Sequence, residues 1–504
     1  MKLSIQQLII QQRPQTGARM CCLLLLMAVI TCTSCKKWLD VQPQSQVSRD
    51  ELFSTEDGFK EAINGLYSRC ARTDLYGMEL LGGFPDVLAQ NYSMATDDPV
   101  RYRQTALYNY KDVDFISRKD SAWRGLYNVI ANANLILENV DKQQSILTPV
   151  NYALIKGEAL AMRAYCHFDV LRLFAASYAA EPNGKGIPYV TAFSKEVPQQ
   201  YKTNEALDLM LKDLEAAKTL LATADPIVSA GYKVGYPIPD SSTEQQGDLF
   251  VQERRHRLNY YAVCGELARV YLYKGDKAHA LSNALEVINA NKFPWTRQSD
   301  FLNPDDTKKD RILYKELLFG FYIPNTTEDL RRLFHNADRG LYITVQEAST
   351  LYETGGVGGE DFRYKQWLSQ QATNTTSYMR LEKYTRDPDQ NLHPQMAPGI
   401  RLSEMYYIAA ECTFDTDPAK AWDYFNTVRL NRGIGAPLSN PSKTVFLQEL
   451  VKEARKEFYG EGQIFYMYKR LNMPITGQNG STVPASSAVM VLPFPDDEIA
   501  YGNR

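Results

Sequence analysis

Adjacent carboxylates are the first feature of the sequence that is able to do chemistry. They occur at Asp97-Asp98, Asp305-Asp306 and Asp496-Asp497. A glycosidase places two carboxyl groups about 5–5.5 Å or about 6.5–9.5 Å apart, on either side of the bond it cleaves. Adjacent aspartates are also common turn and helix-capping residues, and we interpret the three pairs in that way.

Other catalytic and metal-binding motifs are not found. The sequence has no Gly-x-Ser-x-Gly elbow and no phosphate-binding loop, and its five histidines are scattered. Beyond the N-terminal segment the cysteines are Cys70, Cys166, Cys264 and Cys412, which never form a CxxC pair, so zinc ligation is not expected. Each lies in a helical, apolar pattern, which favours a buried free thiol over a disulfide. The sequence therefore predicts a protein that is not an enzyme and has no metal or cofactor.

A polar binding surface is the other chemistry that the sequence offers. Tyrosine is in excess, with 32 residues against 20 phenylalanines, and it combines a flat apolar face with a hydroxyl. Residues 71–120 have no sustained periodicity, and long loops of this kind tend to be functional. Sugar binding requires aromatic faces together with amides, carboxylates or guanidinium groups. The candidate contacts in this loop are Asp86, Gln90, Asn91, Tyr92, Asp98, Tyr102 and Tyr108. Packing of Tyr108 in the core is the alternative.

Helices must hold this loop in place. Apolar residues at three- and four-residue spacing predict helices over Asp57–Arg69, from Trp123 to Val140 and over Asn151–Phe174. Two helical hairpins follow. Leu258–Ile288 turns at Lys274-Gly275-Asp276, and Arg401–Gly433 turns at Asp417-Pro418; both resemble tetratricopeptide hairpins. Neither hairpin is able to bury its apolar face alone, so we expect them to stack on other helices.

The remaining segments are less regular. Residues 292–400 form a loop-rich insert between the hairpins, in which Leu317–Ile323 is rich in strand-forming residues. After the second hairpin, Val445–Tyr459 is predicted to be helical. The domain boundaries that follow are an N-terminal part over residues 51–225, a hairpin over 258–290, the insert over 292–400 and a C-terminal part over 401–504, all in one body.

The N-terminus has the features of an export signal. The apolar stretch Cys21–Ile30 follows basic Arg19 and is too short to span a bilayer, which takes about 20 residues. Thr33-Ser34-Cys35 resembles the cleavage site of bacterial lipoprotein signals, in which the cysteine becomes the lipidated first residue. We therefore predict a signal peptide over residues 1–34, lipidation of Cys35 and a tether over 35–50. An ordinary cleaved signal is the alternative.

The charge of the chain argues against a nucleic-acid partner. The chain has 504 residues, a net charge of −3 and mixed signs throughout, so no basic footprint points to nucleic acid.

Several motifs, taken in order, resemble those of the SusD/RagB family of Bacteroidetes outer-membrane lipoproteins. The resemblance covers nearly the whole chain after the signal. The residues that carry it are Cys35, Leu39, Asp40 and Pro43; Trp123, Leu126, Tyr127, Ile130, Ala133 and Asn134; Ala161, Arg163, Ala164, Tyr165, Gly186, Ile187 and Pro188; Arg401, Leu402, Glu404, Ala410, Glu411, Asn426, Arg429 and Arg432; Glu453, Arg455, Glu457, Glu461, Gly462, Lys469 and Arg470; and Leu492, Pro493, Pro495, Glu498 and Ile499.

The resemblance implies a mainly α fold, in which a tetratricopeptide-like helical-hairpin scaffold (a SusD-like α-α superhelix) carries long loop insertions and a few short strands. It implies an outer-membrane, lipid-anchored protein on the cell exterior, a partner that is a SusC-like TonB-dependent β-barrel transporter, and an oligosaccharide ligand. Family members also take ligand contacts from the insert, where the candidates are Trp295, Arg331 and Tyr342. Three alternatives remain. Trp295 packs on the hairpin instead of contacting a ligand; the ligand is a peptide or glycoprotein; or the protein is a periplasmic tetratricopeptide scaffold.

Among the departures of the chain from the family pattern, three lie close together near the C-terminus. Ala454 and Ile464 replace the usual arginines, and Met467 replaces the usual aspartate. Residues 464 and 467 are neighbours on a helix, and the joint loss of both partners of an ion pair is nearly neutral. We interpret the replacements as a coupled structural change without bearing on ligand binding.

Overall fold

A computed structural model describes residues 49–236, 242–324, 330, 332–335, 340–372, 377–385, 396–477 and 480–502. The chain divides into a unit of residues 1–52, of which only the helix α2 (Arg49–Leu52) is described, and a unit of residues 53–504. The signal peptide, Cys35 and most of the tether lie outside the described residues, so they stay predictions.

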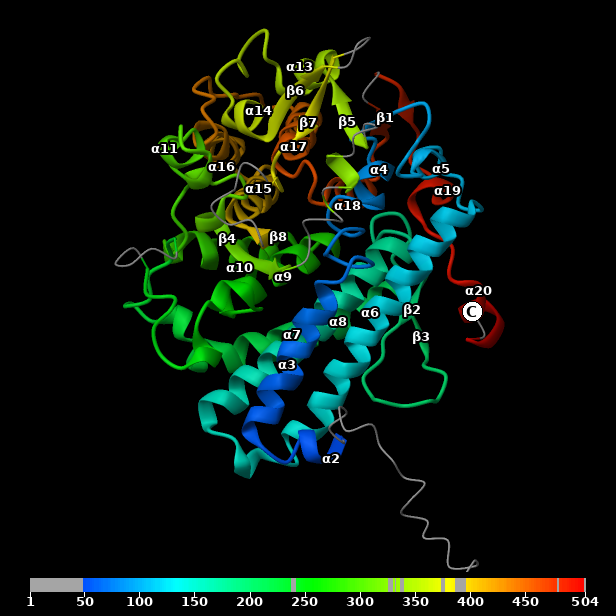
Figure 1. Cartoon of the computed structure of the whole chain (residues 1–504), viewed down its shortest axis with the longest axis vertical. Helices are drawn as coiled ribbons and strands as arrows, with labels where there is room; N and C mark the ends of the chain where they lie inside the picture. The colour runs from blue at the N-terminus through cyan, green and yellow to red at the C-terminus, as the bar shows by residue number, and fades with distance from the viewer. Residues whose placement is uncertain are drawn as a thin grey trace, which may run out of the picture. The chain divides into compact units, whose positions relative to one another are not determined.

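Helices make up most of the larger unit (Figure 1). In chain order they are α3 (Glu56–Cys70), α4 (Phe84–Leu88), α5 (Arg103–Ala106), α6 (Val113–Val140), α7 (Pro149–Phe174), α8 (Thr203–Ala224), α9 (Tyr260–Tyr273), α10 (Lys277–Ala290), α11 (Gln298–Phe301), α13 (Val345–Tyr352), α14 (Phe362–Trp367), α15 (Leu402–Thr413), α16 (Pro418–Leu430), α17 (Lys443–Glu457), α18 (Ile464–Leu471), α19 (Ser487–Met490) and α20 (Asp496–Tyr501). Short 3-10 turns are η2 (Gln144–Ile146), η3 (Pro226–Val228), η4 (Leu249–Val251), η5 (Arg254–His256), η6 (Asp306–Lys308) and η7 (Tyr314–Glu316).

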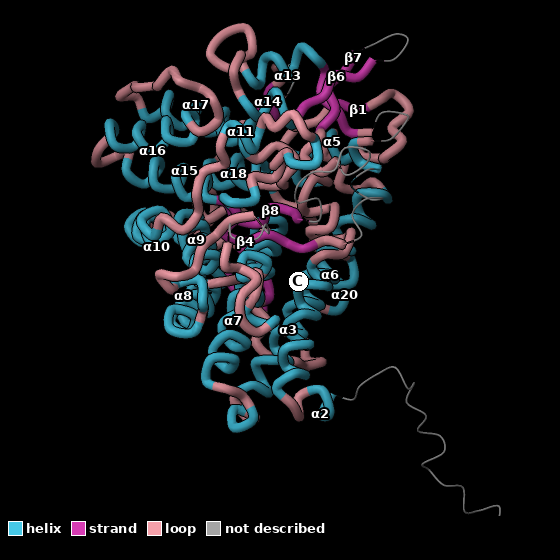
Figure 2. Tube along the Cα trace, turned by 60° about the vertical axis from the view of Figure 1, so that its left-hand side comes forward, coloured by secondary structure: helices cyan, strands magenta, loops and turns pink. Residues whose placement is uncertain are grey.

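The long helices pack as a row of neighbours. Each helix packs on the next: α3 on α6, α6 on α7, α7 on α8, α8 on α9, α9 on α10, α10 on α15 and α15 on α16. Figure 2 shows this row rising from α3 and α7 to α16 and α17. The predicted mainly α scaffold of stacked hairpins is therefore confirmed.

Local signals explain where the two predicted hairpins bend. In the first, Asn259 and Asp276 cap α9 and α10 through their side-chain oxygens, and Gly275 between the helices has a φ of +82°. In the second, Asp417 caps α16 and Pro418 is its first residue. Both hairpins, predicted over Leu258–Ile288 and Arg401–Gly433, are confirmed.

Short strands join distant parts of the chain. The strands are β1 (Ser93–Met94), β2 (Lys185–Pro188), β3 (Gln200–Lys202), β4 (Leu317–Tyr322), β5 (Leu341–Thr344), β6 (Leu368–Ala372), β7 (Ser377–Leu381), β8 (Met396–Arg401), β9 (Ile475–Thr476) and β10 (Thr482–Val483). The largest sheet has the order β1-β5-β7-β6, so the early loop pairs with the insert. β4 forms the strand predicted over Leu317–Ile323 and pairs antiparallel with β8, which leads directly into α15.

The four cysteines of the described chain are buried and free, as the apolar pattern around them predicts. Across the described segments, no helix is both long enough and apolar enough to cross a bilayer.

Gly462 docks the turn after α17 against the early loop. Its φ is +70°, and a Cβ atom there would lie 2.2 Å from the carbonyl oxygen of Leu80. We expect Gly462→Ala to lower the free energy of unfolding by about 2 kcal/mol, because left-handed backbone costs about 1–2 kcal/mol in a residue with a Cβ and the clash adds to it. Urea unfolding measures this. Gly435→Ala is the control, since nothing lies within 4 Å of its Cβ position; an equal loss in both variants would contradict the prediction.

Candidate functional site

A hollow with an exposed aromatic wall lies between α3 and the end of β4, and we call it the α3–β4 groove. It encloses about 850 Å³. Three segments line it: α3 and the turn after it, residues 249–257 around η4 and η5, and the end of β4. The lining residues are Asn64, Tyr67, Ser68, Ala71, Arg72, Thr73, Gly77, Leu249, Gln252, Glu253, His256, Arg257, Tyr322, Ile323 and Pro324.

One wall of the groove is an aromatic platform. The rings of His256 and Tyr322 stack with centroids 6.1 Å apart and planes 10° from parallel. Tyr322 is 48% exposed, although its neighbours along β4 are buried. Burial, followed by the charges of Arg255 and Arg257, lowers the pKa of His256 to about 3, so the imidazole is neutral. The platform therefore offers an uncharged, flat face to a ligand.

A buried carboxylate fixes the base of the groove. Glu158, on α7, accepts hydrogen bonds from the Tyr67 hydroxyl at 2.8 Å, from Arg254 at 2.7 Å and from Arg257 at 3.3 Å. Arg254 is fully buried and also forms a two-point contact with Asp225 at 2.9 and 3.0 Å. Because every charge here has a partner, α3 and η5 are held in one arrangement.

The polar groups of the groove suit hydroxyl-rich ligands. Asn64 and Arg72 are exposed on α3 and the turn after it, and the Arg72 guanidinium forms no hydrogen bond or ion pair with any other described residue. Glu253, which also lines the groove, has a φ of +48°, a left-handed conformation that is uncommon outside glycine. A second hollow of about 650 Å³ shares Ser68, Arg72 and Thr73 with the groove.

The predicted contact residues lie elsewhere. None of those that the structure describes lines the α3–β4 groove. Asp86 and Asn91 are fully buried and Tyr92 is 7% exposed. Asp86 accepts hydrogen bonds from Asn91 at 2.9 Å, Tyr92 at 3.2 Å and the Gly462 N–H at 3.1 Å, and Arg455 donates to Asn91 at 2.9 Å. These three residues hold the early loop against the C-terminal part, so in this arrangement they present no surface to a ligand.

The other predicted residues of the early loop stabilise its own turns. Gln90 donates to the carbonyl oxygen of residue 106 at 2.8 Å, and Tyr108 donates to that of residue 88 at 2.8 Å. Asp98 accepts from the N–H groups of residues 102 and 103, which begins α5. Tyr102 is 1% exposed and donates to Glu79 at 2.9 Å. Asp98 therefore has the turn role that we assigned to adjacent aspartates.

The predicted residues of the insert are separated from one another. The Trp295 ring lies 5.2 Å from Tyr406 of α15 and 5.3 Å from the Arg432 guanidinium, so it packs on the second hairpin. Tyr342, on β5, pairs with Ser93 and contacts the Tyr378 ring at 5.3 Å. Arg331 lies outside the described residues.

Sequence reasoning missed Arg72, His256 and Tyr322. Two local signals mark this site: a tyrosine at the end of a strand just before Pro324, and the run Arg254-Arg255-His256-Arg257 before the first hairpin. Neither signal says that the two segments meet α3.

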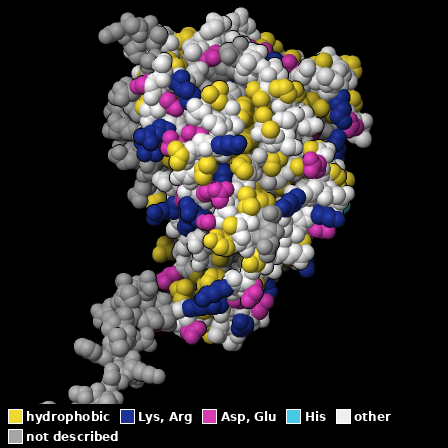
Figure 3. All heavy atoms as spheres, turned by 90° about the vertical axis from the view of Figure 1, so that its right-hand side faces the viewer, with side chains coloured by type: hydrophobic (Ala, Val, Ile, Leu, Met, Phe, Trp, Pro, Cys, Tyr) yellow, Lys and Arg dark blue, Asp and Glu magenta, His cyan; other side chains and the backbone are white. Residues whose placement is uncertain are grey.

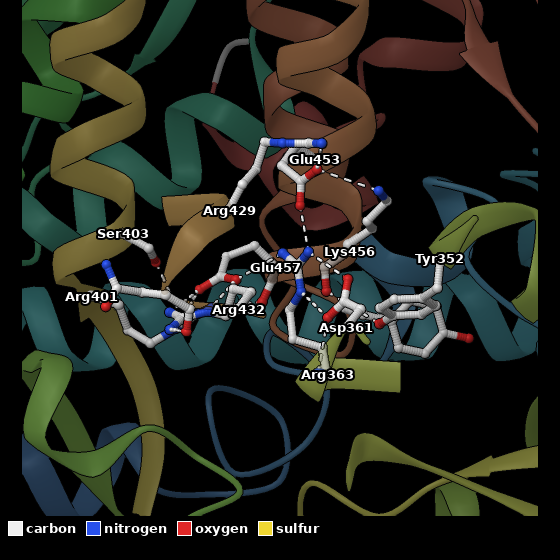
Figure 4. Close-up of polar contacts among 12 residues, drawn as sticks. Tyr352, Asp361, Arg363, Arg401, Ser403, Arg429, Arg432, Glu453, Lys456 and Glu457 are labelled. Carbon is white, nitrogen blue, oxygen red and sulfur yellow. Dashed lines mark hydrogen bonds and ion pairs between the residues drawn. The ribbon is translucent and has the colours of Figure 1, made fainter. Parts of the chain in front are cut away.

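A large cluster of charged residues, by contrast, lies in the interior, all of it buried except Glu353, and we call it the ionic core (Figure 4). Its cationic members are Arg363, Lys383, Arg401, Arg429, Arg432 and Lys456, and its acidic members, equal in number, are Glu316, Glu353, Asp361, Glu453, Glu457 and Glu461. Glu457 accepts from Arg432 at 2.7 Å, from Arg363 at 3.0 Å and from Arg401 at 2.5 Å. Most of the residues that carry the family resemblance near the C-terminus thus stabilise the fold.

The ionic core makes stability depend on pH. Burial alone would raise the pKa of Glu453, but Arg363, Lys456 and Arg429 lower it to about 2, and Arg432 and Arg401 hold the pKa of Glu457 well below its usual range. A depressed carboxyl pKa gives stability that is complete above the unfolded value of 4.5 and is lost as the pH falls toward 2. For Glu453 we expect a loss on the order of 3 kcal/mol.

The Asp86 carboxyl changes the free energy of unfolding in the opposite direction as the pH rises. Burial raises its pKa to about 7, so its contribution falls as the pH rises from 3.8 to that value. Urea unfolding between pH 3 and pH 8 is expected to give a maximum where the two windows overlap, between about pH 3.8 and pH 4.5. A flat profile below that range, or the same acid slope in Glu453→Gln, would argue against the ionic core as its cause.

Asp496 and Asp497 lie in the first turn of α20, as expected for turn and capping residues. No group of three or more potential ligands is placed to hold a metal among the described residues. On the face shown in Figure 3, charges of both signs are interspersed with apolar side chains.

Two protein-family models match the chain. One, SusD-like_3, is described as "Starch-binding associating with outer membrane" and matches residues 37–228. The other, SusD_RagB, is described as the SusD family and matches residues 281–503.

Two curated relatives come from Formosa agariphila. SusD-like protein P25 is 23% identical over 295 residues, which cover 57% of this chain and 49% of the relative. SusD-like protein P38 is 26% identical over 214 residues, which cover 42% of this chain and 38% of the relative. The matched part therefore spans half or less of the length of these relatives.

Solved structures share the fold over nearly their whole length. A SusD superfamily protein from Bacteroides thetaiotaomicron superposes with a TM-score of 0.71 at 22% identity, covering 89% of this chain and 98% of that one. A SusD-like carbohydrate binding protein from Bacteroides vulgatus gives a TM-score of 0.70 at 17% identity, covering 89% and 97%.

Proposed function

Because the chain belongs to the SusD/RagB family, we propose that it is a non-catalytic, lipid-anchored protein of the outer membrane that binds oligosaccharide in the α3–β4 groove. It faces the cell exterior and passes the sugar to a SusC-like TonB-dependent transporter. Family membership supports the class of ligand and the membrane location.

The observation that carries the ligand site is the exposed platform of Tyr322 and His256 in one groove with Arg72, whose guanidinium has no partner among the described residues. Sugar rings have C–H faces that pack on flat aromatic surfaces, and hydroxyls that pair with guanidinium and amide groups. The fixed base around Glu158 means that these groups need little ordering when a ligand binds. The early loop and the insert then support the groove's surroundings rather than contact the sugar.

We expect the mature protein to bind at least one oligosaccharide in a broad glycan panel, measured by calorimetry. Tyr322→Ala and Arg72→Ala should each weaken that affinity about tenfold, or about 1.4 kcal/mol, because each removes one of the two contacts. Tyr501→Ala is the control, since Tyr501 is 77% exposed on α20 and outside the groove. Binding that all three variants retain would place the ligand elsewhere.

Two other outcomes separate the alternatives. If the protein retained peptides or glycoproteins and bound no free glycan, its ligand would be a peptide or glycoprotein instead of an oligosaccharide. The fold assignment would not change. Delivery to a transporter is tested separately: after mild detergent extraction, the native protein should bring down a large β-barrel, and recovery without one would argue against that partner.

A further inference from the structure

A separate cavity lies where five helices meet, and we call it the five-helix cavity. It has a volume of about 90 Å³ and shares no residue with the α3–β4 groove. Side chains from α7, α9, α15, α17 and α18 line it. Its apolar wall consists of Phe168, Leu272, Ile408, Leu450, Ala454, Phe458, Ile464 and Met467.

Three tyrosines on the wall lack hydrogen-bond partners. Tyr273, Tyr407 and Tyr466 are each 4% exposed, and none of their hydroxyls forms a hydrogen bond within the described residues. An unsatisfied buried polar group costs about 1–3 kcal/mol, so such groups are rare, and three at one cavity call for an explanation. A bound molecule with hydroxyl groups of its own would give them partners.

The charged side chains at the cavity are already paired with one another. Arg470 contacts Glu411 through two hydrogen bonds of 2.6 Å, and Arg269 contacts Glu404 through two of the same length. Arg172 donates to Asp169 at 3.1 Å and lies 4.0 Å from the centre of the Tyr466 ring. A charged ligand would find no unpaired counter-charge here, which favours a neutral one.

The size of the cavity limits the ligand further. A single water needs about 10–15 Å³ of such space, so the cavity has room for roughly six to nine non-hydrogen atoms. Gln463, Met467 and Arg470 are partly exposed at its edge, which gives a route from solvent.

We propose that the five-helix cavity binds a small neutral molecule that combines one apolar ring with one or two hydroxyl groups, of the size of phenol or resorcinol. The ring packs against the apolar wall, and its hydroxyls pair with those of the tyrosines. This site is independent of the glycan site and goes beyond the proposed function.

Phenol and resorcinol are the probes, titrated into the full mature protein by calorimetry and soaked into crystals. We expect saturable 1:1 binding, with electron density for the ring in the cavity. The double variant Tyr407→Phe/Tyr466→Phe keeps the shape and removes two hydroxyls, so it should weaken binding at least tenfold. Tyr501→Phe is the matched control and should bind as the unmodified protein does.

Ala454→Leu offers a second test of phenol binding. The larger side chain fills the cavity from α17 and should therefore weaken that binding. Thermal unfolding first confirms that each variant is folded. Benzene and glycerol, which have only the ring or only the hydroxyls, should bind more weakly than phenol. Density for water alone, no saturation by phenol, or equal binding in the double variant and the control would each overturn the proposal.

Discussion

Replacing Glu457 by alanine is expected to lower the free energy of unfolding by about 3–5 kcal/mol, because it leaves buried arginines without their counter-charge. Glu457 is fully buried and pairs with Arg363, Arg401 and Arg432 at once. Its removal therefore affects the strand before α15, the end of α16 and the segment around α14 together. Urea unfolding of the mature protein measures the loss.

The matched control is Glu360→Ala. Glu360 also pairs with a cation, Lys365, at 2.6 Å, but its side chain is 75% exposed. Exposed pairs of this kind are worth about 0–1 kcal/mol, since water solvates both partners when the pair is broken. If Glu457→Ala were no more destabilising than Glu360→Ala, the ionic core would not be what holds the C-terminal part together.

Cys35→Ala is expected to release the protein from membranes into the soluble fraction. A single acyl chain binds a bilayer only marginally, at about 10⁴ M⁻¹, so firm anchoring needs the several chains of a lipoprotein cysteine. Without Cys35 there is no residue to carry them at the predicted cleavage site. Fractionation of cells that express the full chain, followed by immunoblotting, measures the distribution.

Cys32→Ala is the companion variant, because Cys32 lies three residues before the predicted lipidated position. It should remain in the membrane fraction. If Cys35→Ala stayed at the membrane, lipidation at that residue would be ruled out. If Cys32→Ala were released, the cleavage site would have to be assigned to a different position.

The helical scaffold could be predicted from the sequence because its signals are local. The hairpin α9–α10 is defined by apolar spacing, two capping side chains and one glycine, all within Leu258–Ile288. β4 was predictable for the same reason, since its residue types and the following Pro324 are adjacent in the chain.

The candidate site could not be predicted in this way. Asp86, Asn91 and Tyr92 have the residue types of a sugar site. Asp86, however, pairs with Gly462 and Asn91 with Arg455, each more than 350 positions away in the chain, and Tyr92 donates to Asp86. A tyrosine or carboxylate that satisfies a distant backbone has the same local sequence as one that binds a ligand. Tyr322 and Arg72 form a site only because β4 and α3 meet in the fold.

The departures from the family pattern illustrate the same limit. We interpreted Ala454, Ile464 and Met467 as a coupled change without bearing on binding. All three line the five-helix cavity, although Ala454 and Ile464 come from different helices. Helical spacing identified 464 and 467 as neighbours, but it did not place residue 454 beside them.

The ionic core also joins residues that are far apart in the chain, which bears on how the protein folds. Glu316 and Arg432, which pair at 2.6 Å, are 116 positions apart, and Arg363 and Glu457 are 94 apart. Contacts between such distant residues form slowly, and synthesis delivers Glu457 and Glu461 after all the arginines that pair with them. Until residue 457 emerges, the arginines that precede it have no complete set of partners and remain hydrated. We therefore expect the C-terminal half to complete its packing only after residue 457 is available.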